Sequence, residues 1–158
     1  MPPPQLPQPS QKSRYVFVYG TLRSGQERDV NLLLPAPIWV GYGSVHGLLY
    51  DLGAYPGLVS TRERSAQKIR GEIYAITSRL EELLDEIEEV WPQQTGEYAK
   101  LEVDVELESE AQLPAAGGGA RRKKKLRCLV YEIHASRVQG MVLISSGDWV
   151  LHRASKRN

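Results

Sequence analysis

The sequence predicts an α+β fold built on a small curled sheet or barrel with two helices. Three observations lead to this expectation. Several short segments are rich in β-branched and aromatic residues, which favour strands. Glycines recur inside one of these segments, over residues 38–51, as they do at bulges and sharp barrel bends. The helical spacing of apolar residues is clearest in one run, over residues 78–91.

The first half of the core begins with the segment RYVFVYG, residues 14–20, which contains five consecutive strand formers without a polar break. We expect it to be a strand that is buried on both faces and ends at Gly20. Residues 28–34 predict a short helix. An extended segment follows over 38–51, and then a turn over 53–57.

The second half of the core contains the main helix. Residues 69–76 alternate in character, which predicts a strand. In the run that follows, Ser78 and Glu81 form a capping-box pair, and Pro92 is expected to stop the helix. Its apolar positions are Leu80, Leu83, Leu84, Ile87 and Trp91.

Two later segments form a hairpin in this reading. Residues 99–107 alternate between apolar and charged side chains, and residues 126–133 are rich in strand formers. We expect the two strands to pair through a long loop. A last short element is predicted over residues 148–151.

The chain has 158 residues, which is enough for one domain, and we expect that domain to span residues 14–151. Residues 1–13 hold five of the ten prolines and predict a disordered tail. Residues 109–125 contain a glycine triplet and end in the bases Arg121–Lys125, which predicts a flexible basic loop. We expect residues 152–158 to form a basic tail.

Composition excludes several classes of protein. Lys plus Arg number 20 and Asp plus Glu number 19, so the net charge is +1, whereas a nucleic-acid surface is strongly basic. No apolar run reaches the length of a membrane span, and the opening residues lack the apolar centre of a secretory signal. The single Cys128 cannot form an internal disulfide, which favours a reducing, cytoplasmic location. We expect neither nucleic acid nor membrane as a partner, and the oligomeric state stays open.

The near-zero net charge results from two opposed runs. Between Glu81 and Glu110 lie 12 of the 19 acids, with Lys100 as the one base. Six of the 20 bases lie between Arg121 and Arg127, where they could contact an anionic surface or RNA. No aromatic side chain lies among these bases to stack on nucleotides, so a solvated loop is the favoured interpretation.

The first candidate site is the segment Tyr19-Gly20-Thr21-Leu22-Arg23-Ser24-Gly25, between the first strand and the predicted short helix. Successive backbone N–H groups in such a turn, near a helix N-terminus, bind carboxylate or phosphate. Gly20 would let a ligand approach the main chain closely. The segment is not a P-loop, because no Gly-Lys-Ser/Thr sequence follows. An ordinary strand-to-helix turn is the alternative on spacing alone.

The second candidate is Glu88, on the acidic helix. If the apolar stripe is centred near Leu80 and Trp91, a rotation of about 100° per residue places Glu88 roughly 80° from that centre. Glu82 and Glu89 then point nearly opposite, so Glu88 is predicted to be the acid closest to the buried face. Partial burial would raise the pKa of its carboxyl from about 4.3 towards neutrality, which suits a general base. The alternative is an ordinary solvated glutamate at the helix edge.

Other side chains give weaker signals. His46, His134 and His152 are scattered without the spacing of metal ligands, so we expect no metal site. Cys128 alternates with apolar neighbours and is interpreted as a small buried hydrophobe.

Several motifs occur in a fixed order along the chain. Val18-Tyr19-Gly20-Thr21-Leu22-Arg23 comes first, and Tyr55-Pro56-Gly57 follows the glycine-rich strand. Gly71-Glu72-Ile73-Tyr74 precedes the main helix, Leu84-Asp85-x-x-Glu88 closes it, and Tyr98 begins the next strand. This series resembles the signature of the γ-glutamylcyclotransferase-like superfamily, and the resemblance covers residues 14 to about 133.

The resemblance implies a compact, mixed β-barrel flanked by a few helices, with a cavity beside the Tyr-Gly-Thr-Leu turn. It implies that the main chain of Tyr19, Gly20, Thr21 and Leu22 holds the γ-glutamyl group of a small-molecule substrate. Glu88 is then the catalytic acid/base, and Tyr98 is a candidate hydrogen-bond donor to the substrate. The implied reaction is attack of the α-amine on the γ-amide, which yields 5-oxoproline and a free amine without a cofactor.

Three features depart from the family's pattern. Lys100 stands where Arg is frequent, Glu89 stands where Gly commonly follows the glutamate, and residues 109–125 are longer than the expected hairpin loop. These departures leave the pocket for the leaving amine undefined. The alternative function is a non-catalytic small-molecule-binding or interaction module on the same fold.

Overall fold

The structure is a computed structural model that describes residues 14–61, 66–108 and 124–156. The predicted tail over 1–13 and the predicted loop, apart from Lys124 and Lys125, lie outside the described residues. In chain order the elements are β1 (Arg14–Val18), the 3-10 turn η1 (Val30–Leu32), β2 (Ile38–Asp51), β3 (Pro56–Ser60), β4 (Gln67–Ile76), α1 (Ser78–Ile87), β5 (Tyr98–Leu107), β6 (Lys125–Ile133), the 3-10 turn η2 (Ala135–Arg137), β7 (Val142–Leu143) and α2 (Trp149–Lys156).

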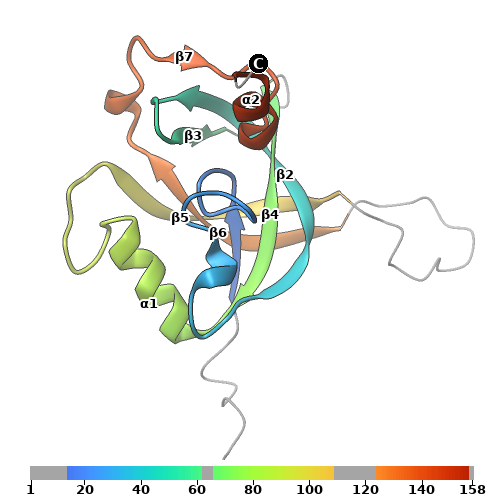
Figure 1. The fold of residues 1–158 in the computed structure, drawn as a ribbon, viewed down its shortest axis with the longest axis vertical. Coiled ribbons are helices and arrows are strands. Elements are labelled where there is room, and N and C mark those ends of the chain that lie inside the picture. The colour runs from blue at the N-terminus through green and yellow to red at the C-terminus, as the bar shows by residue number, and fades with distance from the viewer. Residues whose placement is uncertain (1–13, 62–65, 109–123, 157–158) are drawn as a thin grey trace, which may run out of the picture.

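Five strands close into a barrel (Figure 1). Strands β2, β4, β1, β6 and β5 are neighbours in that order, and β5 pairs back to β2 through Gly43 and Ser44. The sheet is mixed, because β1 runs antiparallel to β4 and parallel to β6. The α+β barrel that the sequence predicts is therefore confirmed, and so is the hairpin of β5 with β6. None of the helices in the described ranges has the length and apolar character needed to cross a bilayer.

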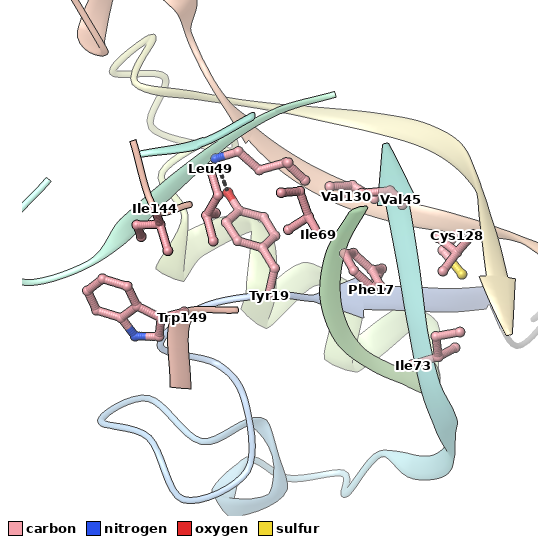
Figure 2. Packing of buried hydrophobic residues seen from close by; sticks show 12 residues of the cluster. Phe17, Tyr19, Val45, Leu49, Ile69, Ile73, Cys128, Val130, Ile144 and Trp149 are labelled. Carbon is pink, nitrogen blue, oxygen red and sulfur yellow. Dashed lines mark hydrogen bonds between the residues drawn. The ribbon is translucent and has the colours of Figure 1, made fainter. Parts of the chain in front are cut away.

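Strand β1 runs through the centre of the molecule and is buried on both faces, as predicted. Phe17 points into the barrel interior, whereas Val16 and Val18 pack on its outer face. Figure 2 shows the interior cluster, in which Phe17 and Tyr19 lie among aliphatic side chains. Trp149 of α2 belongs to the same cluster, so the C-terminal helix contributes to the barrel core.

The outer face of β1 is covered by helix α1. Leu80 and Leu84 are fully buried there against Val16 and Val18. The N-cap is Thr77, one residue before the predicted cap Ser78, because the side chain of Thr77 accepts the Leu80 N–H at 3.2 Å. It ends at Ile87 rather than at Pro92, with Glu88 as the C-terminal capping residue. Trp91 is consequently outside the helix and exposed.

The glycines of β2 allow this long strand to bend around the barrel, as predicted. The register against β4 shifts between Trp39 and Gly41, which marks a bulge. At Gly43, a Cβ atom would lie 2.8 Å from side-chain carbons of Ile73 and Val105. The absence of a side chain there leaves room for these side chains of the two neighbouring strands, β4 and β5.

Three local predictions are wrong. Residues 28–34 form only the short turn η1, because Asp29 caps a 3-10 turn and Leu33 is already extended. Residues 56–60, which include part of the predicted turn, form strand β3 on the edge of β2. Residues 149–156 form helix α2, so most of the predicted basic tail is helical.

Candidate functional site

A cavity of about 190 Å³ lies where the end of β1 meets the C-terminal end of α1. The starts of β3 and β5 and one side chain of β6 complete its wall. It brings together Glu88, Tyr98 and residues 19–22 of the first candidate segment, whereas Arg23, Ser24 and Gly25 of that segment do not line it. The lining residues are Phe17, Val18, Tyr19, Gly20, Thr21, Leu22, Arg28, Tyr55, Pro56, Ile87, Glu88, Glu89, Glu97, Tyr98 and Tyr131.

The turn after β1 uses its carbonyl groups but not its N–H groups. The carbonyls of Gly20, Thr21 and Leu22 accept the N–H groups of Arg23, Arg28 and Val30, at 2.8–3.0 Å. Within the described residues, the N–H groups of the same three residues donate no hydrogen bond. Three successive free donors beside a cavity can bind an anionic group, because buried backbone donors need acceptors.

One reason given for this turn is wrong, and the role of Gly20 has a second part. No α-helix follows it, so a helix dipole does not add to the N–H groups. Gly20 is also required for packing: a Cβ atom there would lie 2.6 Å from Cγ of Pro56. The small side chain therefore makes room for the proline that lines the same cavity.

A buried ion-pair network around Arg23 holds the turn in place. The Arg23 side chain is 4% exposed, and its Nε donates to Oε2 of Glu72 at 2.9 Å. The other carboxylate oxygen of Glu72 accepts the Ser24 N–H at 2.8 Å and the Tyr74 hydroxyl at 2.7 Å. A second acid, Asp148, accepts from Arg23 Nη1 at 2.8 Å. The guanidinium is thus held by one carboxylate from β4 and by another from the residue that precedes α2.

Glu88 lies at the end of α1 and lines the cavity. Burial raises the pKa of its carboxyl to about 7, and the negative charges of Glu97 and Glu89 act in the same direction. The Arg28 guanidinium opposes this rise. A carboxyl with a pKa near 7 can both accept and donate a proton near neutral pH.

Asp85, rather than Glu88, is the most buried acid of α1, so that part of the helical-wheel prediction is wrong. Asp85 is 8% exposed. Its carboxylate accepts the Tyr131 hydroxyl at 2.7 Å and contacts Lys100 Nζ at 3.0 Å. Both partners are donors, so Asp85 links α1 to β5 and β6 one turn before Glu88.

The two predicted tyrosines have internal partners. The Tyr19 hydroxyl donates to the Tyr131 carbonyl at 2.6 Å and accepts the Leu58 N–H at 3.3 Å, within the interior core (Figure 2). Burial raises the pKa of this phenol well above its ordinary value. The Tyr98 hydroxyl lies on the cavity wall and donates to the Pro56 carbonyl at 3.1 Å.

The cavity residues that were not among the sequence-based candidates include Tyr55, Glu97 and Arg28. Tyr55 donates to Glu97 at 2.6 Å, which joins the segment before β3 to the segment before β5. Arg28 supplies the only cation of the cavity lining. The Tyr55-Pro56 pair in the predicted turn was a sequence signal for Tyr55. No local sequence signal marks Glu97 or Arg28, because the fold brings these two residues to the cavity from separate loops.

The arrangement places groups that can bind an anion beside a carboxyl that can transfer a proton. Free N–H groups and one guanidinium lie in the same cavity as a carboxyl of near-neutral pKa. No group of three or more His, Cys, Asp or Glu side chains suited to a metal ion occurs in residues 14–61, 66–108 and 124–156. The polar groups of the cavity lining are those of its acids, its tyrosines, Arg28 and the main chain.

A comparison with known protein families finds a match over most of the chain. A model of the family described as "Gamma-glutamyl cyclotransferase, AIG2-like" matches residues 16–151. A protein of Vibrio cholerae serotype O1, named "Putative gamma-glutamylcyclotransferase", is 39% identical over 75 residues. That match covers 48% of this chain and 62% of the Vibrio protein.

Solved structures share the fold. YkqA from Bacillus subtilis superposes with a TM-score of 0.63 at 26% identity, over 92% of this chain and 43% of that one. The chain therefore spans less than half of YkqA. A mouse AIG2-like protein superposes with a TM-score of 0.59 at 22% identity, over 82% and 84% of the two chains.

Proposed function

Because this chain belongs to the gamma-glutamyl cyclotransferase, AIG2-like family, we propose that it converts a γ-glutamyl amine or amino acid into 5-oxoproline and a free amine. The observation that carries the proposal is Glu88, whose carboxyl has a pKa of about 7 in a cavity shared with the free N–H groups after β1. The free N–H groups can bind the α-carboxylate of such a substrate, and the Glu88 carboxyl can exchange protons with its nitrogen atoms.

The turn after β1 and Arg28 bind the α-carboxylate of the substrate in this proposal. Three N–H groups and a guanidinium complement a carboxylate, and Arg–carboxylate contacts are strong when partly shielded from water. Anchoring the carboxylate fixes the end of the substrate that carries the α-amine. The chain then folds back so that the amine approaches its own γ-carbonyl, an orientation effect that can lower the barrier by several kcal/mol.

Glu88 moves the protons. An α-ammonium group has a pKa of about 8, so it must lose a proton before it can attack. The Glu88 carboxylate takes that proton, and the amine nitrogen forms a bond to the γ-carbonyl carbon. Glu88 then gives this proton to the leaving nitrogen as the bond between that nitrogen and the same carbon breaks. The attacking nitrogen, which still carries two protons and a positive charge after the new bond forms, loses one of them to the same carboxylate, and Glu88 passes it to the released amine. The carboxylate is regenerated, and the two products are 5-oxoproline and the amine in its protonated form.

The test is incubation of the protein with a panel of γ-glutamyl amides and dipeptides, with 5-oxoproline as the measured product. We expect product from at least one compound, and its loss in Glu88→Gln. Glu86→Gln is the matched control, since Glu86 is an exposed acid of the same helix outside the cavity. If no compound yields 5-oxoproline but some bind in both proteins, the function is that of a non-catalytic binding module.

A further inference from the structure

Asp148, the residue that precedes helix α2, contacts the turn after β1. Its Oδ1 accepts from Arg23 Nη1 at 2.8 Å, and the Asp148 side chain is 14% exposed. Neither residue lines the cavity. Arg23 directly follows Leu22, however, so any shift of its main chain displaces the last of the free N–H groups.

Asp148 itself is held rigidly. Its Oδ1 accepts the Leu151 N–H at 3.2 Å and so caps the first turn of α2. The preceding Gly147 has a φ of +70° and packs against the main chain of Lys68, and its carbonyl accepts the Arg70 N–H at 2.8 Å. The carboxylate is therefore fixed relative to β4, on which Glu72 also lies.

We infer that Asp148 is a positioning residue for the anion-binding turn and acts through Arg23. A buried guanidinium held by two fixed carboxylates has one orientation, whereas one carboxylate leaves it free to rotate. Rotation of Arg23 would carry Leu22 and Thr21 away from the place where a substrate carboxylate binds. The inference rests on the proposed function only in assigning a carboxylate to this turn.

The variant that tests the role is Asp148→Asn. Asn is a good helix cap and has the shape of Asp, so α2 keeps its first turn while Arg23 loses one charge partner. The matched control is His152→Ala. His152 also anchors α2, through Nε2 at 2.8 Å from Asp51 Oδ2, but it has no contact with Arg23.

The kinetic readout compares a γ-glutamyl amide that has a free α-carboxylate with its α-carboxamide counterpart. In Asp148→Asn we expect KM for the carboxylate substrate to rise about tenfold while kcat changes less than about threefold. The preference for the carboxylate substrate should fall by the same factor. His152→Ala should keep the wild-type preference. Equal behaviour of the two variants, or an unchanged preference in Asp148→Asn, would overturn the role.

A second readout needs no turnover. Glutarate carries carboxylates but no amine, and we expect it to shift the amide NMR signals of Thr21 and Leu22 in the wild-type protein. Asp148→Asn should need about ten times more glutarate for the same shift. If Asp148→Asn needs more glutarate than the wild type but no 5-oxoproline forms, the cyclisation proposal fails and the role of Asp148 stands; equal glutarate requirements would overturn that role. If those signals do not move, the role of Asp148 is overturned.

If Asp148→Asn fails to fold, Asp148→Glu is measured in its place. This change keeps the charge and displaces it by one methylene, so we expect the same loss of carboxylate preference at a smaller size. Wild-type preference in a folded Asp148→Glu protein would contradict the role of Asp148.

Discussion

Gly20 lies so close beneath Pro56 that a Cβ atom on the glycine would be 2.6 Å from Cγ and 2.8 Å from Cδ of the proline ring. Both residues line the cavity, and the carbonyl of Pro56 also accepts the Tyr98 hydroxyl. The turn after β1, the start of β3 and the start of β5 are thus fitted together at one contact. A change at Gly20 is transmitted to all three.

Gly20→Ala should therefore lower both stability and substrate binding. Overpacking at a tight contact costs about 1–3 kcal/mol, and relief requires the proline or the turn to move. We expect a lower midpoint of urea unfolding and a higher KM. Gly41→Ala is the control, because the nearest atom to its Cβ would be a Leu107 methyl carbon at 3.4 Å. Equal stability of the two variants would contradict the tight packing at Pro56.

The pH dependence of turnover should report the Glu88 carboxyl. Because the base must be ionised to accept a proton, we expect kcat/KM to rise with pH through a midpoint near 7. The Glu97 charge raises this pKa and the Arg28 charge lowers it. Glu97→Gln should therefore move the midpoint down, and Arg28→Gln should move it up. A midpoint that moves in the same direction in both variants would exclude Glu88 as the titrating base.

Glu88→Gln should change the pH dependence of stability. The folded-state pKa of about 7 is above the ordinary value of 4.5, so this group contributes stability below pH 4.5 that is lost as pH rises through 7. Glu88→Gln has no carboxyl to ionise at this position, so it does not lose this stability as the pH rises. A shift of this size corresponds to at most about 3 kcal/mol, reduced here by contact with solvent.

The measurement is urea unfolding of both proteins at pH 5 and pH 8.5. We expect Glu88→Gln to gain stability relative to wild type between the two pH values. The exposed control, Glu86→Gln, should show no such gain. A wild-type protein whose stability relative to Glu88→Gln is the same at both pH values would contradict a raised pKa.

How much of the fold was predictable depends on whether the signal was local. Strand β1 was predicted from its unbroken run of strand formers, and helix α1 from the helical spacing of its apolar residues. Strand β3 is short and begins with Pro56-Gly57, which is a turn signal, and only its ladder with β2 makes it a strand. Helix α2 reads as a basic tail because its burial depends on Trp149, which packs on distant strands.

The residues of the candidate site were likewise predictable only where the sequence signal was local. The turn after β1 and Glu88 were found because their motifs are contiguous. Asp85 was misjudged, because a helical wheel treats the second face as solvent, whereas Tyr131 and Lys100 reach this face from two strands. Arg28 was missed because η1 replaces the expected helix and leaves the arginine on a loop at the cavity wall.

Glu89 occupies a position that suits glycine. Its φ is +55°, a left-handed conformation that costs a residue with a side chain roughly 1 kcal/mol. It follows the capping residue Glu88, where helices commonly end in glycine. The departure from the family's pattern noted in the sequence therefore has a structural cost at the edge of the cavity.

Two substitutions separate the strain at Glu89 from its charge. Glu89→Gly removes both, whereas Glu89→Gln keeps the strained conformation and removes only the charge. Since the Glu89 charge raises the Glu88 pKa, both variants should lower the midpoint of the pH–rate profile. Only Glu89→Gly should also be more stable, by up to about 1 kcal/mol after the greater freedom of glycine in the unfolded chain is counted. Urea unfolding of the two variants, side by side, decides the point: equal stability would mean that the left-handed backbone at this position carries no cost.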